Sequence, residues 1–318
     1  MFRTAVLTLL AACSTVPERS AATLVGTGGS GPAPTEFADP VEELGSVTWP
    51  RGLDGAMARS KASGKPVLVL FDEVPGCSTV KGFGTGALTH PLLAEAIETA
   101  FEPVVVYNNT ADDAALCARF DEPRWNNPVV RYLDGDGRDV APRFAGPYTE
   151  AAFAESLAGA LGSRAPEWLT LIRDELVAAD RAETATYSMA CFWSGEAHLG
   201  SVDGVVGTRT GWQGGREVVE VRFDPDRTTR RDLDRHASSG GARPMEQGSL
   251  SPTPGDDRYR LRHTEWASVP MTPTQATRAN ALLSEGKDPS ALFSPRQQAR
   301  KGGALGDLGS SDLRAAFR

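Results

Sequence analysis

A continuous apolar run near residue 66 sets the strongest limit on the fold of this chain. Residues 66–71 read Pro-Val-Leu-Val-Leu-Phe, with no polar position to mark a solvent-facing side. A strand of this kind is covered on both faces, as in α/β proteins whose helices pack on each side of a sheet. A second such run, 104–107, follows a segment of helical periodicity that we expect Thr89 to cap. This region is therefore expected to form an α/β domain.

The same domain continues through a third strand and a closing helix. Pro128 precedes the apolar residues 129–133, and Asp-Gly-Asp-Gly at 134–137 has the chemistry of a tight hairpin turn. Residues 148–161 show helical periodicity, with Gly162 just past the end. We assign residues 41–163 to this domain.

The N-terminus predicts export from the cytoplasm. A basic start, Met1-Phe2-Arg3, is followed by an apolar stretch too short to span a bilayer, and Leu-Ala-Ala precedes Cys13. Residues 1–13 resemble a bacterial lipoprotein signal, which implies that Cys13 is lipidated and anchors the chain on a membrane surface, on the periplasmic side of the envelope. The alternative is an ordinary cleaved signal peptide. Residues 14–40 are rich in Gly, Ser, Thr and Pro and are expected to form a disordered tether.

Charge and residue spacing exclude some classes of function. The chain has 41 acidic and 33 basic residues, a formal net charge of -8 and a pI near 5.2. Nucleic-acid binding needs concentrated Lys and Arg, so no nucleic-acid partner is expected. No set of residues has metal-ligand spacing, and no cofactor is predicted.

The second half contains a cysteine at a strand-to-helix junction. Residues 186–190 read as the end of a strand, and the spacing after Cys191 indicates the start of a helix. The helix dipole and free N–H groups there favour a thiolate, which is a nucleophile. Phe192 and Trp193 can wall an apolar pocket beside it.

A second reactive cysteine is predicted in the first domain. The loop 74–79 reads Val-Pro-Gly-Cys-Ser-Thr, and the Pro-Gly pair indicates an exposed turn at Cys77. The alternative is a buried, inert thiol. Cys117 is expected to be a small core residue in a short helix, with a disulfide to Cys77 as the alternative.

The loop and the order of elements resemble thioredoxin-like proteins, specifically a small bacterial family of thioredoxin-like proteins and selenoproteins with the motif Val-Pro-Gly-(Cys or Sec)-x-Thr. The resemblance implies a redox role for Cys77 and places Pro128 at the fold's cis-proline. Pro75, Gly76 and Thr79 would belong to the same site, with Thr79 positioned to hydrogen-bond the thiolate. Val80 departs from ordinary thioredoxin, because Cys-x-x-Cys is absent and Cys77 has no local disulfide partner.

Residues 184–286 resemble the A-type peptide methionine sulfoxide reductases, and six matching motifs occur in the family's order. They are Cys-Phe-Trp-x-x-Glu at 191–196, Gly-Val to Gly-Gly at 204–215, Glu217 to Asp-Pro at 217–225, His236, Tyr-Arg at 259–260 and Met-Thr-Pro-Thr-Gln at 271–275. The resemblance implies an α+β fold after the thioredoxin-like α/β domain. Residues 164–183 are expected to form a bridging helix, and residues 287–318 a loose C-terminal extension.

The resemblance also implies a chemistry. Cys191 would attack the sulfoxide sulfur while Glu217 protonates the departing oxygen, and an apolar pocket would keep that carboxyl protonated. The substrate methyl group would bind against aromatic residues, and Tyr259 would donate a hydrogen bond to the oxygen. The aromatic residues are Phe192, Trp193 and Trp212.

Three departures from the family are visible. The long loop after Gly-Gly is missing, since Gly215 is followed directly by Arg216 and Glu217. The aspartate that supports the tyrosine is not clearly matched in 254–259, and no cysteine follows Cys191.

We therefore expect an exported thiol oxidoreductase that reduces methionine sulfoxide in peptides or proteins through Cys191. Cys77 would serve as its resolving or recycling thiol, and the external thiol donor is not indicated by the sequence. One alternative is a thioredoxin-like peroxide or disulfide reductase whose second domain is degenerate and non-catalytic. Another is a surface lipoprotein that only binds partners.

Overall fold

The computed structural model describes residues 35–125, 128–246, 248–303, 313 and 317. Cys13, the signal segment 1–13 and most of the tether 14–40 lie outside the described residues, as does Asn127. Among the helices that the model describes, none is long and apolar enough to cross a membrane.

The first part of the described chain is built on a three-stranded sheet. Strands β1 (Val67–Asp72) and β2 (Glu102–Tyr107) are parallel, and β3 (Val129–Leu133) pairs antiparallel with β1, giving the order β2-β1-β3. All six residues of β1 are buried, as the apolar run predicted. The helical elements of this part are η1 (Glu42–Leu44), α1 (Leu53–Ser63), α2 (Ser78–Thr85), η2 (Ala87–Thr89), α3 (Pro91–Ala100), α4 (Ala114–Arg119), α5 (Glu150–Leu161) and η3 (Gly162–Arg164).

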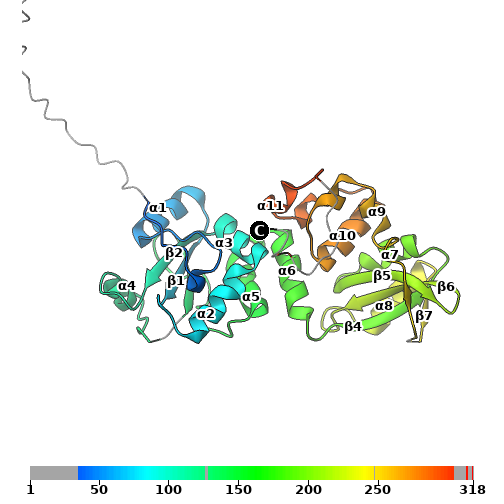
Figure 1. The fold of residues 1–318 in the computed structure, drawn as a ribbon, viewed down its shortest axis with the longest axis horizontal. Coiled ribbons are helices and arrows are strands. Elements are labelled where there is room, and N and C mark those ends of the chain that lie inside the picture. Colours follow the sequence, from blue (N-terminus) through cyan, green and yellow to red (C-terminus); the bar gives the residue numbers. More distant parts are fainter. Residues whose placement is uncertain (1–34, 126–127, 247, 304–312, 314–316, 318) are drawn as a thin grey trace, which may run out of the picture. The chain divides into compact units, whose positions relative to one another are not determined.

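Helices cover both faces of this sheet (Figure 1). The residues of β1 divide between two hydrophobic clusters, because successive side chains of a strand point to opposite faces. Leu68 and Leu70 belong to the cluster with α2, α3 and α5, whereas Val67, Val69 and Phe71 belong to the cluster with α1 and α4. This arrangement explains why β1 has no polar alternation.

The structure answers two local expectations, one about a helix cap and one about a turn. The N-cap of α3 is His90 and not Thr89, because Pro91 starts the helix and the His90 ring accepts a hydrogen bond from Leu93 N–H. The tight turn at 134–137 is present, with Asp134 N–H bonded to Arg138 C=O and Gly137 at a φ of 81°.

The second part is built on a five-stranded antiparallel sheet of order β7-β4-β6-β5-β8. Its strands are β4 (Glu183–Ser188), β5 (Val205–Gln213), β6 (Arg216–Phe223), β7 (Arg243–Met245) and β8 (Ser251–Pro252). Its helical elements are α7 (Phe192–Gly200), α8 (Arg230–Ser239), α9 (Tyr259–Arg262), η4 (Glu265–Ser268) and α10 (Pro273–Ser284). Helices α7 and α8 bury their apolar residues against β4 and β6.

Helix α6 (Glu167–Ala178) contributes to two hydrophobic clusters. Trp168, Leu169 and Ile172 join the cluster that contains α3 and α5, and Leu171 joins the cluster that contains α10. A helix therefore does occupy the segment 164–183.

The extension 287–318 was expected to be loose, and this is wrong for its described first half. Residues 290–298 form η5 (Ser290–Leu292) and α11 (Pro295–Gln298), and Phe293 is completely buried against Trp266. Buried Glu95 accepts hydrogen bonds from Ser294 Oγ at 2.5 Å and from Arg296 N–H at 2.7 Å. Proline and glutamine content alone did not reveal these long-range contacts.

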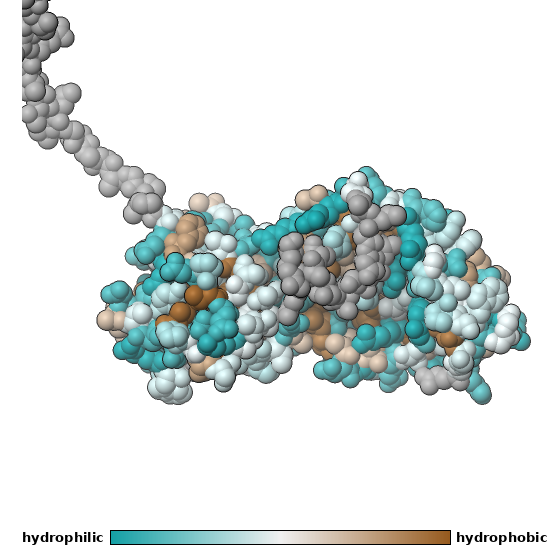
Figure 2. All heavy atoms as spheres, in the orientation of Figure 1, coloured by the Kyte–Doolittle hydropathy of each residue, from teal (hydrophilic) through white to brown (hydrophobic). Residues whose placement is uncertain are grey.

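The surface view agrees with this distribution of residues. On the face that Figure 2 draws, hydrophilic residues dominate and hydrophobic ones form small separate patches. The large apolar side chains lie mainly in the clusters described above.

Candidate active site

Cys191 is the N-cap residue of α7, directly after β4. Its thiol is partly exposed and is not joined to another cysteine, since Cys77, Cys117 and Cys191 are all free among the described residues. Ser194 Oγ donates a hydrogen bond to Cys191 Sγ at 3.8 Å. A hydroxyl donor and a helix start both stabilise negative charge on the sulfur. Ser194 was given no role from the sequence.

Glu217 lies beside this helix start. The pairing of β4 with β6 continues into a bond from Met189 N–H to Glu217 C=O at 3.1 Å, which places residue 217 next to the turn before Cys191. Phe192 N–H then donates to Glu217 Oε2 at 2.7 Å. The other carboxyl oxygen of Glu217 remains for a ligand.

Close packing holds α7 in this position. A Cβ atom on Gly195 would lie 1.4 Å from Met189 Sδ, so any side chain at residue 195 would require the Met189 side chain to move. The absence of a side chain at Gly195 lets the first turn of α7 sit directly over Met189.

The expected aromatic residues gather around the same helix start. The Phe192 ring lies 6.0 Å from Trp193 and 6.0 Å from Trp212, between ring centroids. Tyr259 stacks on Trp193 at 4.1 Å, and no described residue receives a hydrogen bond from its hydroxyl. Asp256 accepts the Trp193 indole N–H at 3.2 Å, so one acidic residue of the segment 254–259 supports the tryptophan, while Asp257 bonds Thr210.

A cleft of about 390 Å³ opens beside Glu217. Its lining residues are Ser188, Met189, Ala190, Trp212, Arg216, Glu217, Gly241 and Arg243. It combines the Trp212 ring, the Glu217 carboxyl group and the backbone that leads to Cys191, while Cys191 itself is not one of the lining residues. This composition suits a small polar group with an apolar end.

Glu196 is a buried carboxyl group beneath this site whose environment the sequence did not reveal. Its side chain accepts hydrogen bonds from Thr208 Oγ1 at 3.0 Å and from Arg258 N–H at 2.6 Å. Burial raises the pKa of Glu196 to about 7, although Arg258 opposes the shift. In the sequence, the signal that Glu196 belongs to this site was its position in the Cys-Phe-Trp-x-x-Glu motif.

The Cys77 loop precedes α2, and Cys77 is the exposed N-cap residue of that helix. Gly76 N–H donates to Glu43 Oε1 at 3.0 Å, and this bond holds the pKa of the buried Glu43 below its usual value. A Cβ on Gly76 would lie 2.4 Å from Val80, so glycine is needed there. Because Cys77 is exposed, the alternative of a buried thiol is wrong, and the reactivity of Cys77 stays a prediction.

The other loop residues are placed as follows. The Val74–Pro75 peptide bond is cis. Thr79 is exposed in the first turn of α2, and no hydrogen bond joins its hydroxyl to Cys77. Tyr148 donates to Pro128 C=O at 2.8 Å. Because Asn127 lies outside the described residues, the cis bond expected at Pro128 stays a prediction.

Asp72 is a buried acidic residue at the end of β1, just before the Cys77 loop. It is completely buried, and its Oδ2 atom has no hydrogen-bond partner in the described structure. Burial raises its pKa to about 8. The sequence signal for a buried carboxyl group here was an acidic residue at the end of an unbroken apolar run.

Cys117 is buried in α4, and burial raises the pKa of its thiol, which disfavours a resolving role.

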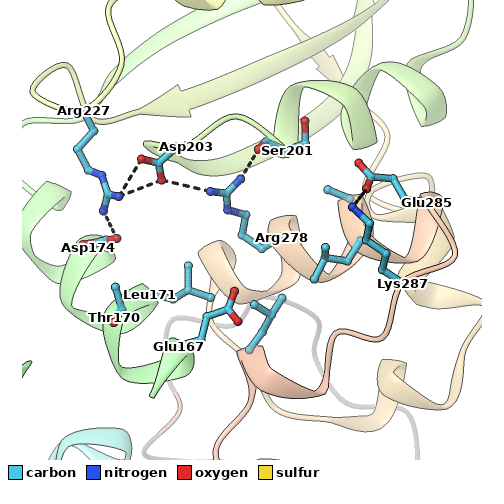
Figure 3. Close-up of a pocket in the computed structure, with 13 residues that line it drawn as sticks. Glu167, Thr170, Leu171, Asp174, Ser201, Asp203, Arg227, Arg278, Glu285 and Lys287 are labelled. Carbon is cyan, nitrogen blue, oxygen red and sulfur yellow. Dashed lines mark hydrogen bonds and ion pairs between the residues drawn. The ribbon is translucent and has the colours of Figure 1, made fainter. Parts of the chain in front are cut away.

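A separate cavity of about 360 Å³ lies next to α6 and α10 (Figure 3). Its arginines are already paired: Arg227 contacts Asp174 and Asp203, and Arg278 contacts Asp203 at 3.3 Å. None of the cysteines lines it.

No protein-family model matches the chain. Among curated proteins, peptide methionine sulfoxide reductase MsrA of Methanothermobacter thermautotrophicus is 43% identical over 63 residues. The C-terminal half resembles MsrA. The match covers 14% of this chain and 37% of the curated relative, so it spans little more than a third of that protein's length.

A solution structure of a thioredoxin from Thermus thermophilus is similar in fold to part of the chain. It matches with a TM-score of 0.33 and 23% identity, covering 37% of this chain and 90% of that one. The strand order β2-β1-β3, with helices on both faces, is an α/β arrangement, and the five-stranded antiparallel sheet with its helices follows it in the chain. The expected order of an α/β domain followed by an α+β domain is confirmed.

Proposed function

We propose that the protein is a thiol-dependent oxidoreductase that reduces methionine sulfoxide in peptides or proteins at Cys191. The observation that carries this proposal is the 2.7 Å bond from Phe192 N–H to the Glu217 carboxyl group, which puts an acid and a nucleophile at one helix start. The similarity to MsrA supports the choice of substrate.

The chemistry balances as a two-electron transfer. The Cys191 thiolate attacks the sulfoxide sulfur, and Glu217 gives a proton to the sulfoxide oxygen through the carboxyl oxygen that Phe192 does not bind. The sulfur–oxygen bond of the substrate breaks and the oxygen passes to Cys191 as a sulfenic acid. The substrate sulfur is reduced to the thioether, and the cysteine sulfur is oxidised by the same two electrons.

A second thiol must then restore Cys191. It attacks the sulfenic sulfur, forms a disulfide and releases water. We assign this role to Cys77, because it is exposed and at a helix start, whereas Cys117 is buried. A dithiol donor reduces the resulting disulfide in two exchange steps.

The direct test uses purified protein, a dithiol and a peptide that contains the S epimer of methionine sulfoxide. Mass spectrometry should detect methionine with the wild type and none with Cys191→Ser. Sulfoxide left unreduced by the wild type would overturn the proposal.

The shortened hairpin before Glu217 favours one second candidate. Gln213 pairs directly with Arg216, so only two residues join β5 and β6. If this leaves the MsrA-like site without activity, the protein would act as a thioredoxin-like peroxide or disulfide reductase through Cys77. Rapid oxidation of Cys77 by peroxide, with no sulfoxide reduction, would select this function.

Export and lipid anchoring belong to the same proposal. They depend on the basic start, the apolar stretch and Cys13. Mass spectrometry of the mature protein should find acyl chains on residue 13, and Cys13→Ser should release the protein from membranes.

A further inference from the structure

The cleft beside Glu217 is lined by two arginines that the proposed reaction does not use. Arg216 and Arg243 both line it, together with Trp212. In the described part of the chain, neither guanidinium forms an ion pair or donates a side-chain hydrogen bond. Several other arginines of this domain are engaged, as in the pairs of Arg209 with Glu220 and Arg227 with Asp203.

Local structure places Arg216 at the cleft. Gly214 and Gly215 have φ values of 58° and 72°, which suits a two-residue hairpin turn between Gln213 and Arg216. Arg216 is the first residue after this short turn and the residue before Glu217. Both Arg216 and Glu217 line the cleft.

Arg243 reaches the same cleft from another strand. It pairs with Ser188 of β4, three residues before Cys191, and Ser188 in turn pairs with Val218 of β6. Two arginines from β6 and β7 therefore flank the backbone that leads to the thiol. Glu217 is the one carboxylate among the residues that line this cleft, and one of its oxygens is occupied by Phe192 N–H.

We propose that Arg216 and Arg243 select methionine sulfoxide that has a carboxylate beside it in the substrate. The carboxylate belongs to a flanking Asp or Glu side chain or to the C-terminus of the peptide. This inference rests on the proposed function, since it assigns a substrate class to the same site. Two arginines can bind a carboxylate by charge-assisted hydrogen bonds.

The expected size of the preference for a carboxylate follows from the solvent exposure of Arg216 and Arg243. Both arginines are exposed, so solvent and salt screen their attraction for a carboxylate. The preference for an acidic substrate should therefore be modest, about fivefold, and should decrease as ionic strength rises.

The test measures binding to Cys191→Ser protein by calorimetry, so that it does not depend on turnover. Four methionine sulfoxide peptides are compared: one flanked by Glu, one flanked by Gln, one flanked by Lys, each amidated at the C-terminus, and the Gln-flanked peptide with a free C-terminus. The expected result is a Kd about fivefold lower for the Glu-flanked peptide than for the Gln-flanked one. The fourth peptide shows whether a chain-terminal carboxylate serves as well.

Charge reversal supplies the matched variants. Arg216→Glu with Arg243→Glu should abolish the preference for Glu and favour the Lys-flanked peptide. Arg235→Gln, which changes an exposed arginine on α8, should leave the order of affinities unaltered.

Equal Kd values for the Glu-flanked and Gln-flanked peptides at low salt would overturn this inference, and so would an unchanged order in the reversed variant. The proposed function would survive either result, provided the wild type reduces the Gln-flanked peptide. If the wild type reduces none of the peptides, the proposed function itself is overturned.

Discussion

Phe192 N–H and the Glu217 carboxylate are joined by a 2.7 Å hydrogen bond, although 25 residues separate them in the chain. The bond ties the start of α7 to the start of β6. It fixes where an acid stands relative to Cys191, because Phe192 is the next residue.

Glu217→Gln should lower kcat/KM for methionine sulfoxide reduction by at least about 100-fold, because the amide keeps the bond to Phe192 but cannot supply a proton. Steady-state kinetics with a sulfoxide peptide measure this. Glu220→Gln on the same strand, which removes a pair with Arg209, should change the rate by less than about twofold. A comparable loss in both variants would contradict the assignment of Glu217 as the acid.

Cys77→Ser should separate the first turnover from recycling. Reduction of one equivalent of sulfoxide per enzyme should proceed normally, whereas repeated turnover with a protein donor should slow by about tenfold. Cys117→Ala is the matched control, because the buried Cys117 is not expected to take part. Unchanged recycling in Cys77→Ser would show that Cys191 is restored by the donor alone.

Asp72→Asn should change how stability depends on pH. Burial raises the pKa of Asp72 from 3.8 unfolded to about 8 folded, so the folded protein holds this proton over that range. The wild type therefore loses stability as pH rises from about 4 to about 8, and the variant does not. The gain in the variant at pH 8 should be about 5 kcal/mol and should vanish near pH 4.

Thermal unfolding at several pH values measures the effect of Asp72→Asn. Asp112→Asn, at an exposed position of the same part, should show no gain. A pH-independent effect of Asp72→Asn would indicate that residue 72 is already ionised in the folded protein.

Glu196→Gln, in the MsrA-like domain, should also change how stability depends on pH, over a lower pH range than Asp72→Asn. The pKa of Glu196 is raised from 4.5 to about 7, so the wild type loses stability as pH rises between these values. The variant should lack this decline, which amounts to about 2 kcal/mol. Urea unfolding at pH 5 and pH 7.5 tests it, with exposed Glu183→Gln as control. Parallel pH profiles of wild type and Glu196→Gln would be the contrary result.

Local patterns in the sequence predicted several elements and the surroundings of two thiols. The apolar run 66–71 predicted a strand buried on both faces, the spacing after Cys191 predicted a cysteine at a helix start, and the Pro-Gly pair predicted that Cys77 is exposed. Such inferences succeed because strand burial and helix capping depend on residues that are neighbours in the chain.

The tertiary structure decided which polar groups meet. The bond of Glu217 to Phe192, the burial of Asp72 and Glu196, and the cleft shared by Arg216 and Arg243 all depend on strand pairing and packing between distant segments. The same is true of Phe293, whose burial against Trp266 turned an expected loose extension into part of a core. Periodicity shows that a residue can be buried, but only the packed chain shows against what, and desolvation by those neighbours raises the pKa values of Asp72 and Glu196.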